Sequence, residues 1–211
     1  MAEALQREIS RAQVNELPIR RYEGEVLLVE SPEDLERAMA DIRGESALGF
    51  DTETRPAFRK GESHLPALAQ LATARAVYLF RLQHQDFGGA IAEILSSQRI
   101  VKAGVGLAHD LRELRRLFAS QPASVVDLGA AAKRRGVRQT GLRNLAGLFL
   151  GFRIPKGTKT SNWAARRLSP QQIAYAATDA WACRELYLEF RRLGLVDESS
   201  PAPDAHACQT A

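Results

Sequence analysis

Two acidic residues, Asp51 and Glu53, lie two positions apart at the end of the apolar segment 47–53, whose pattern predicts a buried strand. Side chains two positions apart on a strand point to the same face of a sheet. Two neighbouring carboxylates repel each other, and their burial is costly unless a cation neutralises them. The pair therefore indicates a cation site, and solvation at the end of a strand stays open as the simpler explanation.

Three further residues have the types and positions that such a site needs. Asp110 begins a predicted amphipathic helix directly after the apolar segment VKAGVGLA, at the carboxyl edge where α/β sheets bind ligands. Tyr175 and Asp179 are four positions apart in another predicted helix and therefore share one face. Each also has a structural explanation: Asp110 would stabilise the positive end of its helix, and Tyr175 would hydrogen-bond to Asp179.

The elements that must position these residues follow from apolar periodicity and capping signals. Three strands joined by short connections, at residues 47–53, 67–73 and 76–80, predict an antiparallel meander. After the meander, strands alternate with helices, which favours parallel pairing. The other predicted strands are 26–29, 100–103 and 124–126, and the predicted helices include 32–43, 87–96, 108–118 and 170–193. This order predicts an α/β fold with a mixed sheet.

Length and composition set the class of protein. The 211 residues suffice for one domain, and 45% apolar with 26% charged residues is typical of globular proteins. No apolar run approaches the roughly 20 residues of a membrane-spanning helix. The first eighteen residues match neither a secretory signal nor an acid-poor transit peptide, which predicts an intracellular, cytoplasmic protein. We expect an N-terminal extension over residues 1–20, one domain over 21–196 and a disordered tail over 197–211.

The positive charge of the chain is unevenly distributed. Residues 128–178 include no Asp or Glu, yet they include ten Lys and Arg residues. Such a field attracts a polyanion, because phosphates release counterions when they bind cations. The alternative is a solvated basic face that pairs with acids elsewhere in the fold.

The segments GFDTET, VKAGVGLAHDLREL and YAATDA resemble, in this order, the three exonuclease motifs of the DEDD superfamily in its tyrosine variant, the family of ribonuclease D and the Werner syndrome exonuclease. The run KGTKTSNWAARRLSPQQIAYAATDA also resembles that family's approach to its third motif. The resemblance covers residues 24–193. It implies a ribonuclease H-like α/β fold, with a mixed sheet of five to six strands, three antiparallel and then parallel, flanked by helices. It further implies hydrolytic removal of nucleotides from a 3′ end.

Carried over residue by residue, the resemblance implies two divalent cations. Asp51, Glu53 and Asp179 would bind one, Asp51 with Asp110 would bind the other, and Tyr175 would orient the attacking water. Oxygen ligands without Cys or His select Mg²⁺ or Mn²⁺ over zinc. A phenol with a pKa of about 10 stays protonated at neutral pH, so Tyr175 suits hydrogen bonding rather than proton abstraction.

The implied partner is nucleic acid with a free 3′ end, and the DTET and GVG segments are closer to the Werner branch, which favours DNA slightly over RNA. Within the basic stretch, we expect Lys156, Lys159 and Arg166 to contact phosphates of the entering strand. Phe58 would lie against the terminal base, or would be an ordinary loop aromatic. Two other functions stay open: a catalytically silent nucleic-acid-binding module and an exoribonuclease acting on short RNA.

Histidines and cysteines give little support to a competing site. His109 precedes Asp110 as a general base would, but Tyr175 fills the helix position beside Asp179, so we expect His109 to be structural. GVGLAH has that histidine where a dinucleotide fingerprint needs glycine or alanine. The two cysteines, Cys183 and Cys208, are too few for a disulfide framework or a four-cysteine zinc site.

Overall fold

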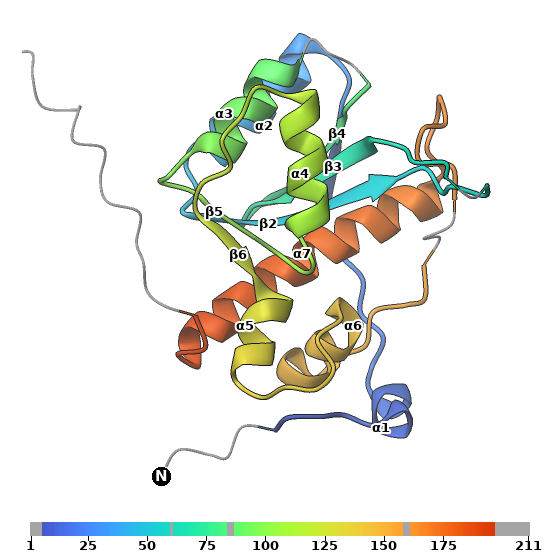
Figure 1. The fold of residues 1–211 in the computed structure, drawn as a ribbon, viewed down its shortest axis with the longest axis vertical. Helices are drawn as coiled ribbons and strands as arrows, with labels where there is room; N and C mark the ends of the chain where they lie inside the picture. Colours follow the sequence, from blue (N-terminus) through green and yellow to red (C-terminus); the bar gives the residue numbers. More distant parts are fainter. Residues whose placement is uncertain (1–5, 60, 84–86, 158–160, 197–211) are drawn as a thin grey trace, which may run out of the picture.

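The computed structural model describes residues 6–59, 61–83, 87–157 and 161–196, and Figure 1 shows their arrangement. The predictions made for Lys159, for Cys208 and for the tail over 197–211 lie outside the described residues. In the part of the chain that is described, none of the helices combines the length and apolar character that crossing a membrane requires.

Six strands form one mixed sheet, in the order β1-β4-β3-β2-β5-β6. The meander of β2, β3 and β4 is antiparallel, whereas β1 pairs with β4, β2 with β5 and β5 with β6 in parallel. The strands are β1 (Glu25–Val29), β2 (Ala47–Thr54), β3 (Pro66–Ala72), β4 (Ala76–Arg81), β5 (Val101–Gly104) and β6 (Val125–Asp127). The predicted mixed sheet is confirmed, and β2, which carries the first two acids, lies inside it between β3 and β5.

The longer helices begin and end where local signals place them. Ser31 and Ser169 form capping boxes before α2 and α7, each with a proline in the first turn. Gly194, with a φ of 64°, follows the end of α7. The helices are α1 (Arg11–Glu16), α2 (Pro32–Ile42), α3 (Gly88–Ser96), α4 (Ala108–Leu117), α5 (Leu128–Arg134), α6 (Leu142–Leu145), the π-helical turn η2 (Ala146–Leu150) and α7 (Pro170–Arg192).

Helices cover the sheet on both faces. On one face, α2, α3 and α4 pack against β2 through a core that includes Ile42, Phe50 and Leu114. On the other face, α7 crosses β2, β3 and β4, as Figure 1 shows in orange, over a core with Leu68 and Trp163. The strand with the acids is therefore held between two apolar layers, which fixes it against movement.

The segment before β1 packs against the domain. Ile9 is buried, its amide donates to the Gln139 side chain, and its side chain lies against η2 at Gly147. Further on, a single parallel bridge joins Ile19 to Arg153. Helix α1 was not predicted, because none of its six residues is buried and no apolar stripe marks it. The domain boundaries proposed at residues 20 and 196 stay predictions.

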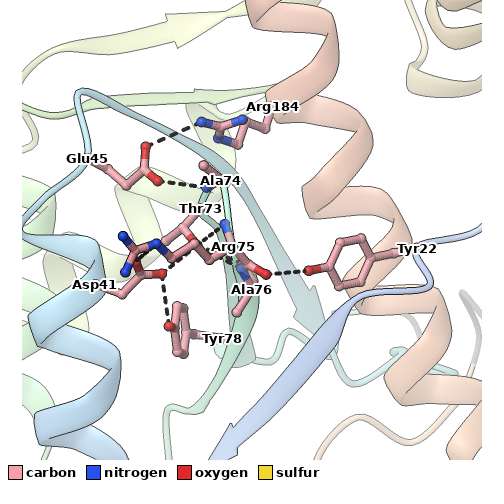
Figure 2. Close-up of polar contacts among 9 residues, drawn as sticks. All are labelled: Tyr22, Asp41, Glu45, Thr73, Ala74, Arg75, Ala76, Tyr78 and Arg184. Atoms are coloured by element: carbon pink, nitrogen blue, oxygen red, sulfur yellow. Dashed lines mark hydrogen bonds and ion pairs between the residues drawn. The ribbon is translucent and has the colours of Figure 1, made fainter.

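A network of polar contacts fastens α2, the turn between β3 and β4, and α7 together (Figure 2). The hydroxyls of Thr73 and Tyr78 both donate to Asp41, at 2.7 and 2.9 Å. Glu45 accepts from the Ala74 amide at 2.7 Å and pairs with Arg184 of α7 at 3.3 Å. Each carboxylate in this network thus has donors supplied by neighbouring elements.

Candidate active site

Three carboxylates converge where β2 faces α7. Oxygen atoms of Asp51, Glu53 and Asp179 all lie within 4.8 Å of one another. Glu53 and Asp179 are each 7% exposed, and Asp51 is half-buried. Three like charges this close in a partly desolvated place are costly without a cation, and carboxylate oxygens are the ligands that Mg²⁺ and Mn²⁺ prefer. This donor set therefore fits the metal that the motifs imply.

Direct backbone contact between β2 and α7 sets the spacing of these acids. A Cβ atom on Gly49 would lie 2.0 Å from the carbonyl oxygen of Ala180, far inside van der Waals contact. Only glycine therefore lets the helix approach the strand this closely. Because Asp179 precedes Ala180 and Asp51 follows Gly49 by two residues, the contact brings the two acids together.

Asp110 reaches the same cleft from a third element. It lies in the first turn of α4, directly after β5, as predicted, and it is half-buried. Burial raises the pKa of its carboxyl group, and the neighbouring Thr52 hydroxyl and His109 lower it to a smaller extent. Asp110 lines the cleft with the three acids but is not part of their tight cluster. Asp110 therefore adds a fourth carboxylate to the cleft.

Tyr175 lies one helical turn before Asp179, with its ring held from two sides. The ring centroid is 5.9 Å from that of Trp163, and a Cβ atom on Gly157 would come within 1.6 Å of ring carbon Cδ2. Burial raises the pKa of the phenol well above its ordinary value, and the charges of Asp179 and Glu53 raise it further. The phenol therefore keeps its proton at neutral pH and acts as a hydrogen-bonding group.

The acids open into a cleft of about 980 Å³ that Tyr175 also lines. The first turn of α6 forms part of its wall, with Arg143 and Asn144, and Lys156 and His109 line it as well. His109 is exposed, and its Nδ1 lies 2.6 Å from a guanidinium nitrogen of Arg112. One cation of the predicted set, Lys156, is therefore found in the cleft wall.

Two other predicted nucleic-acid contacts are found outside the walls of the cleft. Phe58 is 78% exposed on the loop after β2, and it does not line the cleft. Arg166 is exposed, and its backbone carbonyl accepts a hydrogen bond from Arg81. Sequence position near a motif does not fix the direction of a side chain, so the roles of both residues stay predictions.

Arg143 and Asn144 are cleft residues that the motifs do not single out. Arg143 belongs to the acid-free basic stretch, but ten cations in one stretch do not show which of them reaches the site. The nearest local feature in the sequence is Gly141, the N-cap residue of α6, which has no side chain to cap the helix. The fold was needed to bring this turn into the same cleft as the acids.

Comparison with known proteins agrees with this geometry. The chain is 28% identical over 199 residues to a 3′-5′ exonuclease of Arabidopsis thaliana, which covers 85% of this chain and 68% of that protein. It is 32% identical over 165 residues to ribonuclease D of Gluconacetobacter diazotrophicus, covering 76% of this chain. The chain spans 41% of that ribonuclease and 27% of the exonuclease mut-7 homolog of Aedes aegypti, so these relatives are much longer.

Solved structures share the fold. The EXO domain of Aedes aegypti Nibbler superposes with a TM-score of 0.71 at 25% identity, over 82% of this chain and 90% of that one. Brucella melitensis NrnC bound to pGG superposes with a TM-score of 0.64 at 22% identity, over 85% and 83% of the two chains. A model of the 3′-5′ exonuclease family matches residues 26–194. The chain therefore belongs to the 3′-5′ exonuclease family of the DEDD superfamily.

Proposed function

We propose that this chain hydrolyses phosphodiester bonds of nucleic acid from the 3′ end, with the help of two divalent cations, Mg²⁺ or Mn²⁺. The observation that carries the proposal is the convergence of Asp51, Glu53 and Asp179 in one cleft, which Asp110 and Tyr175 also line. These five residues are the ones that match the three motifs of the tyrosine variant. A silent binding module would have no need for all five.

Asp51, Glu53 and Asp179 would hold one cation, and Asp51 with Asp110 would hold the other. When bound, such ions lower the pKa of the attacking water and stabilise the leaving 3′ oxygen. The raised pKa of Asp110 supports this assignment, because a partly buried carboxylate gains from a cation placed beside it. Asp51 would touch both ions and is therefore the residue whose loss should be most damaging.

Tyr175 would orient the attacking water. Its phenol stays protonated, since burial and the neighbouring acids raise its pKa. A protonated phenol can donate one hydrogen bond and accept another, so it can hold a water molecule in a fixed direction beside the acids. Because Trp163 and Gly157 contact the ring, the hydroxyl keeps one position. Such positioning lowers the entropic part of the barrier to attack.

DNA is the substrate that we favour slightly, on the strength of the DTET and GVG segments. A second substrate class, short RNA, has its own support. The chain is similar to a protein named ribonuclease D, and it shares its fold with NrnC, whose structure contains pGG. Either substrate would place backbone phosphates in a cleft that has Lys156 and Arg143 in its walls.

The test is a nuclease assay with end-labelled DNA and RNA of several lengths, in Mg²⁺, in Mn²⁺ and in EDTA. We expect stepwise shortening from the 3′ end that needs the added ion and stops in EDTA. Asp51→Asn should lower turnover by roughly 10³-fold or more, because a group that touches the reacting centre is lost.

The matched control is Glu93→Gln, which removes an exposed carboxylate that pairs with Arg43 and does not line the cleft. It should leave turnover unchanged. Shortening of equal rate in exhaustively chelated protein, or an Asp51→Asn variant that is folded and fully active, would contradict the proposal.

A further inference from the structure

One wall of the cleft includes a guanidinium nitrogen that has no hydrogen-bond partner within the described residues. Arg143, in the first turn of α6, is half-buried and lines the cleft with the acids. Its Nη2 nitrogen is shielded from solvent and makes no hydrogen bond within the described residues. A shielded guanidinium nitrogen without an acceptor is unfavourable, so an acceptor from water, an ion or a ligand would stabilise it.

Other shielded arginines either have partners or lie outside the cleft. Arg81 donates to the backbone carbonyls of Ala165 and Arg166, and Arg184 pairs with Glu45. Arg153 and Arg184 each have a shielded Nε without a partner within the described residues, but neither lines the cleft. Arg143 thus combines three properties: a half-buried side chain, a donor without a partner within the described residues, and access to the place where the substrate would lie.

Charge balance indicates what Arg143 would bind. Four carboxylates with two divalent cations are close to neutral, so the charge of a phosphodiester in the cleft stays uncompensated. A guanidinium matches the oxygen atoms of a phosphate with two parallel N–H donors, a geometry that a lysine ammonium cannot offer. Lys156 also lines the cleft but is exposed, so it would contribute a screened and less directed attraction.

We propose that Arg143 binds one backbone phosphate within the 3′-terminal nucleotides of the strand whose end lies among the acids. The inference rests on the proposed function, because it takes the substrate to be a nucleic-acid strand. The bound phosphate would hold the strand at the α6 side of the cleft, which helps to fix the position of the scissile bond. Arg143 would then act on one linkage, unlike cations that attract the backbone in general.

The test measures binding of 5′-labelled single-stranded oligonucleotides, with Ca²⁺ in place of Mg²⁺ and strand length checked in the same samples. Each oligonucleotide has the same sequence, and one of its last three linkages is replaced by a neutral methylphosphonate. For the full chain, we expect one replacement to weaken binding by about tenfold, as for a lost charge-assisted hydrogen bond. In Arg143→Ala that penalty should fall below about twofold, and the salt slope of binding should decrease by about one.

Arg143→Lys and Arg134→Ala complete the design. Arg143→Lys keeps the positive charge but loses the two parallel N–H donors of the guanidinium. It should therefore have the salt slope of the wild type but only part of the linkage-specific penalty. Arg134 is exposed in the last turn of α5, within the same basic stretch and outside the cleft. Its alanine variant should keep the full linkage-specific penalty of the wild type. Melting curves of all variants verify that they fold.

Two different failures can be told apart. If the penalty of each methylphosphonate is the same in the wild type and in Arg143→Ala, the phosphate assignment is wrong, whatever the wild type does to its substrate. If the wild type does not shorten labelled strands in Mg²⁺ or Mn²⁺, the proposed function is wrong. A linkage-specific penalty that depends on Arg143 would then still show a phosphate-binding position.

Discussion

Two polar clusters lie toward opposite ends of β2, and they differ in how their buried charges are balanced. In the network of Figure 2, Glu45 and Arg184 have opposite charges and are 13% and 14% exposed. Toward the other end of the strand, Asp51, Glu53 and Asp179 gather charges of one sign within 4.8 Å. In the first arrangement the chain supplies both signs of charge, and the pair stabilises the fold. In the second arrangement a divalent cation would offset charges of one sign, which is why that cluster indicates function.

Among residues outside the proposed metal ligands, Tyr175, which neighbours the acid cluster, should give the largest effect on turnover. Tyr175→Phe keeps the ring between Trp163 and Gly157 and removes one oxygen. If the hydroxyl orients the water, turnover should fall by roughly 10²- to 10⁴-fold while folding and Mn²⁺ affinity stay the same. Single-turnover kinetics and Mn²⁺ titration measure both quantities. A phenylalanine variant within about threefold of the wild type would show that the ring only packs.

Gly157→Ala should have the next largest effect, and it should act through Tyr175. The added methyl group would overlap the ring at 1.6 Å, although the backbone at position 157 has no positive φ that would itself exclude alanine. We expect turnover to fall by about tenfold, because a displaced hydroxyl no longer holds the water in line.

In a Tyr175→Phe background the same Gly157→Ala change should cost no further turnover, since the hydroxyl is already absent. Gly89→Ala is the matched control, because a Cβ there meets nothing within 4 Å. Independent, multiplying losses in the double variant would mean that Gly157 acts on the substrate directly.

The smallest effect on turnover is expected for substitutions in the polar network of Figure 2. Glu45→Gln removes the charge that pairs with Arg184, and it should lower the free energy of unfolding by about 2 kcal/mol while turnover stays within about twofold. The exposed pair of Arg43 and Glu93 offers the comparison, since Glu93→Gln should cost less than about 1 kcal/mol. Denaturant melts measure both. A large loss of turnover in folded Glu45→Gln would show that the two clusters are coupled through α7.

Local chemistry made much of the fold predictable. Ser31 and Ser169 cap their helices through contacts within three residues, so the sequence alone locates α2 and α7. The meander follows from three apolar runs joined by short connections. Helix α1 and the π-helical turn η2 were missed, because a six-residue helix without buried residues and a local widening of the helix leave no periodic signal.

The acids of the site were predictable from their motifs, and the surrounding wall was not. Asp51, Glu53 and Asp179 meet because two regular elements cross, and their positions along those elements could be counted. Arg143 enters the cleft from a turn whose place depends on the packing of α6 and η2 against α7. Phe58 was expected to lie against the terminal base or to be an ordinary loop aromatic; its side chain is exposed on the loop after β2, and its role stays a prediction.

Gly49 sets the distance between β2 and α7. Peptide atoms of the two elements touch there, so repacking of side chains on this face cannot change the spacing between Asp51 and Asp179. Mg²⁺ holds its oxygen ligands at about 2.0–2.1 Å and Ca²⁺ at about 2.3–2.6 Å. The backbone contact at Gly49 thus limits how far apart the two carboxylates can be held. A larger residue at position 49 would push α7 away from β2 and separate Asp51 from Asp179.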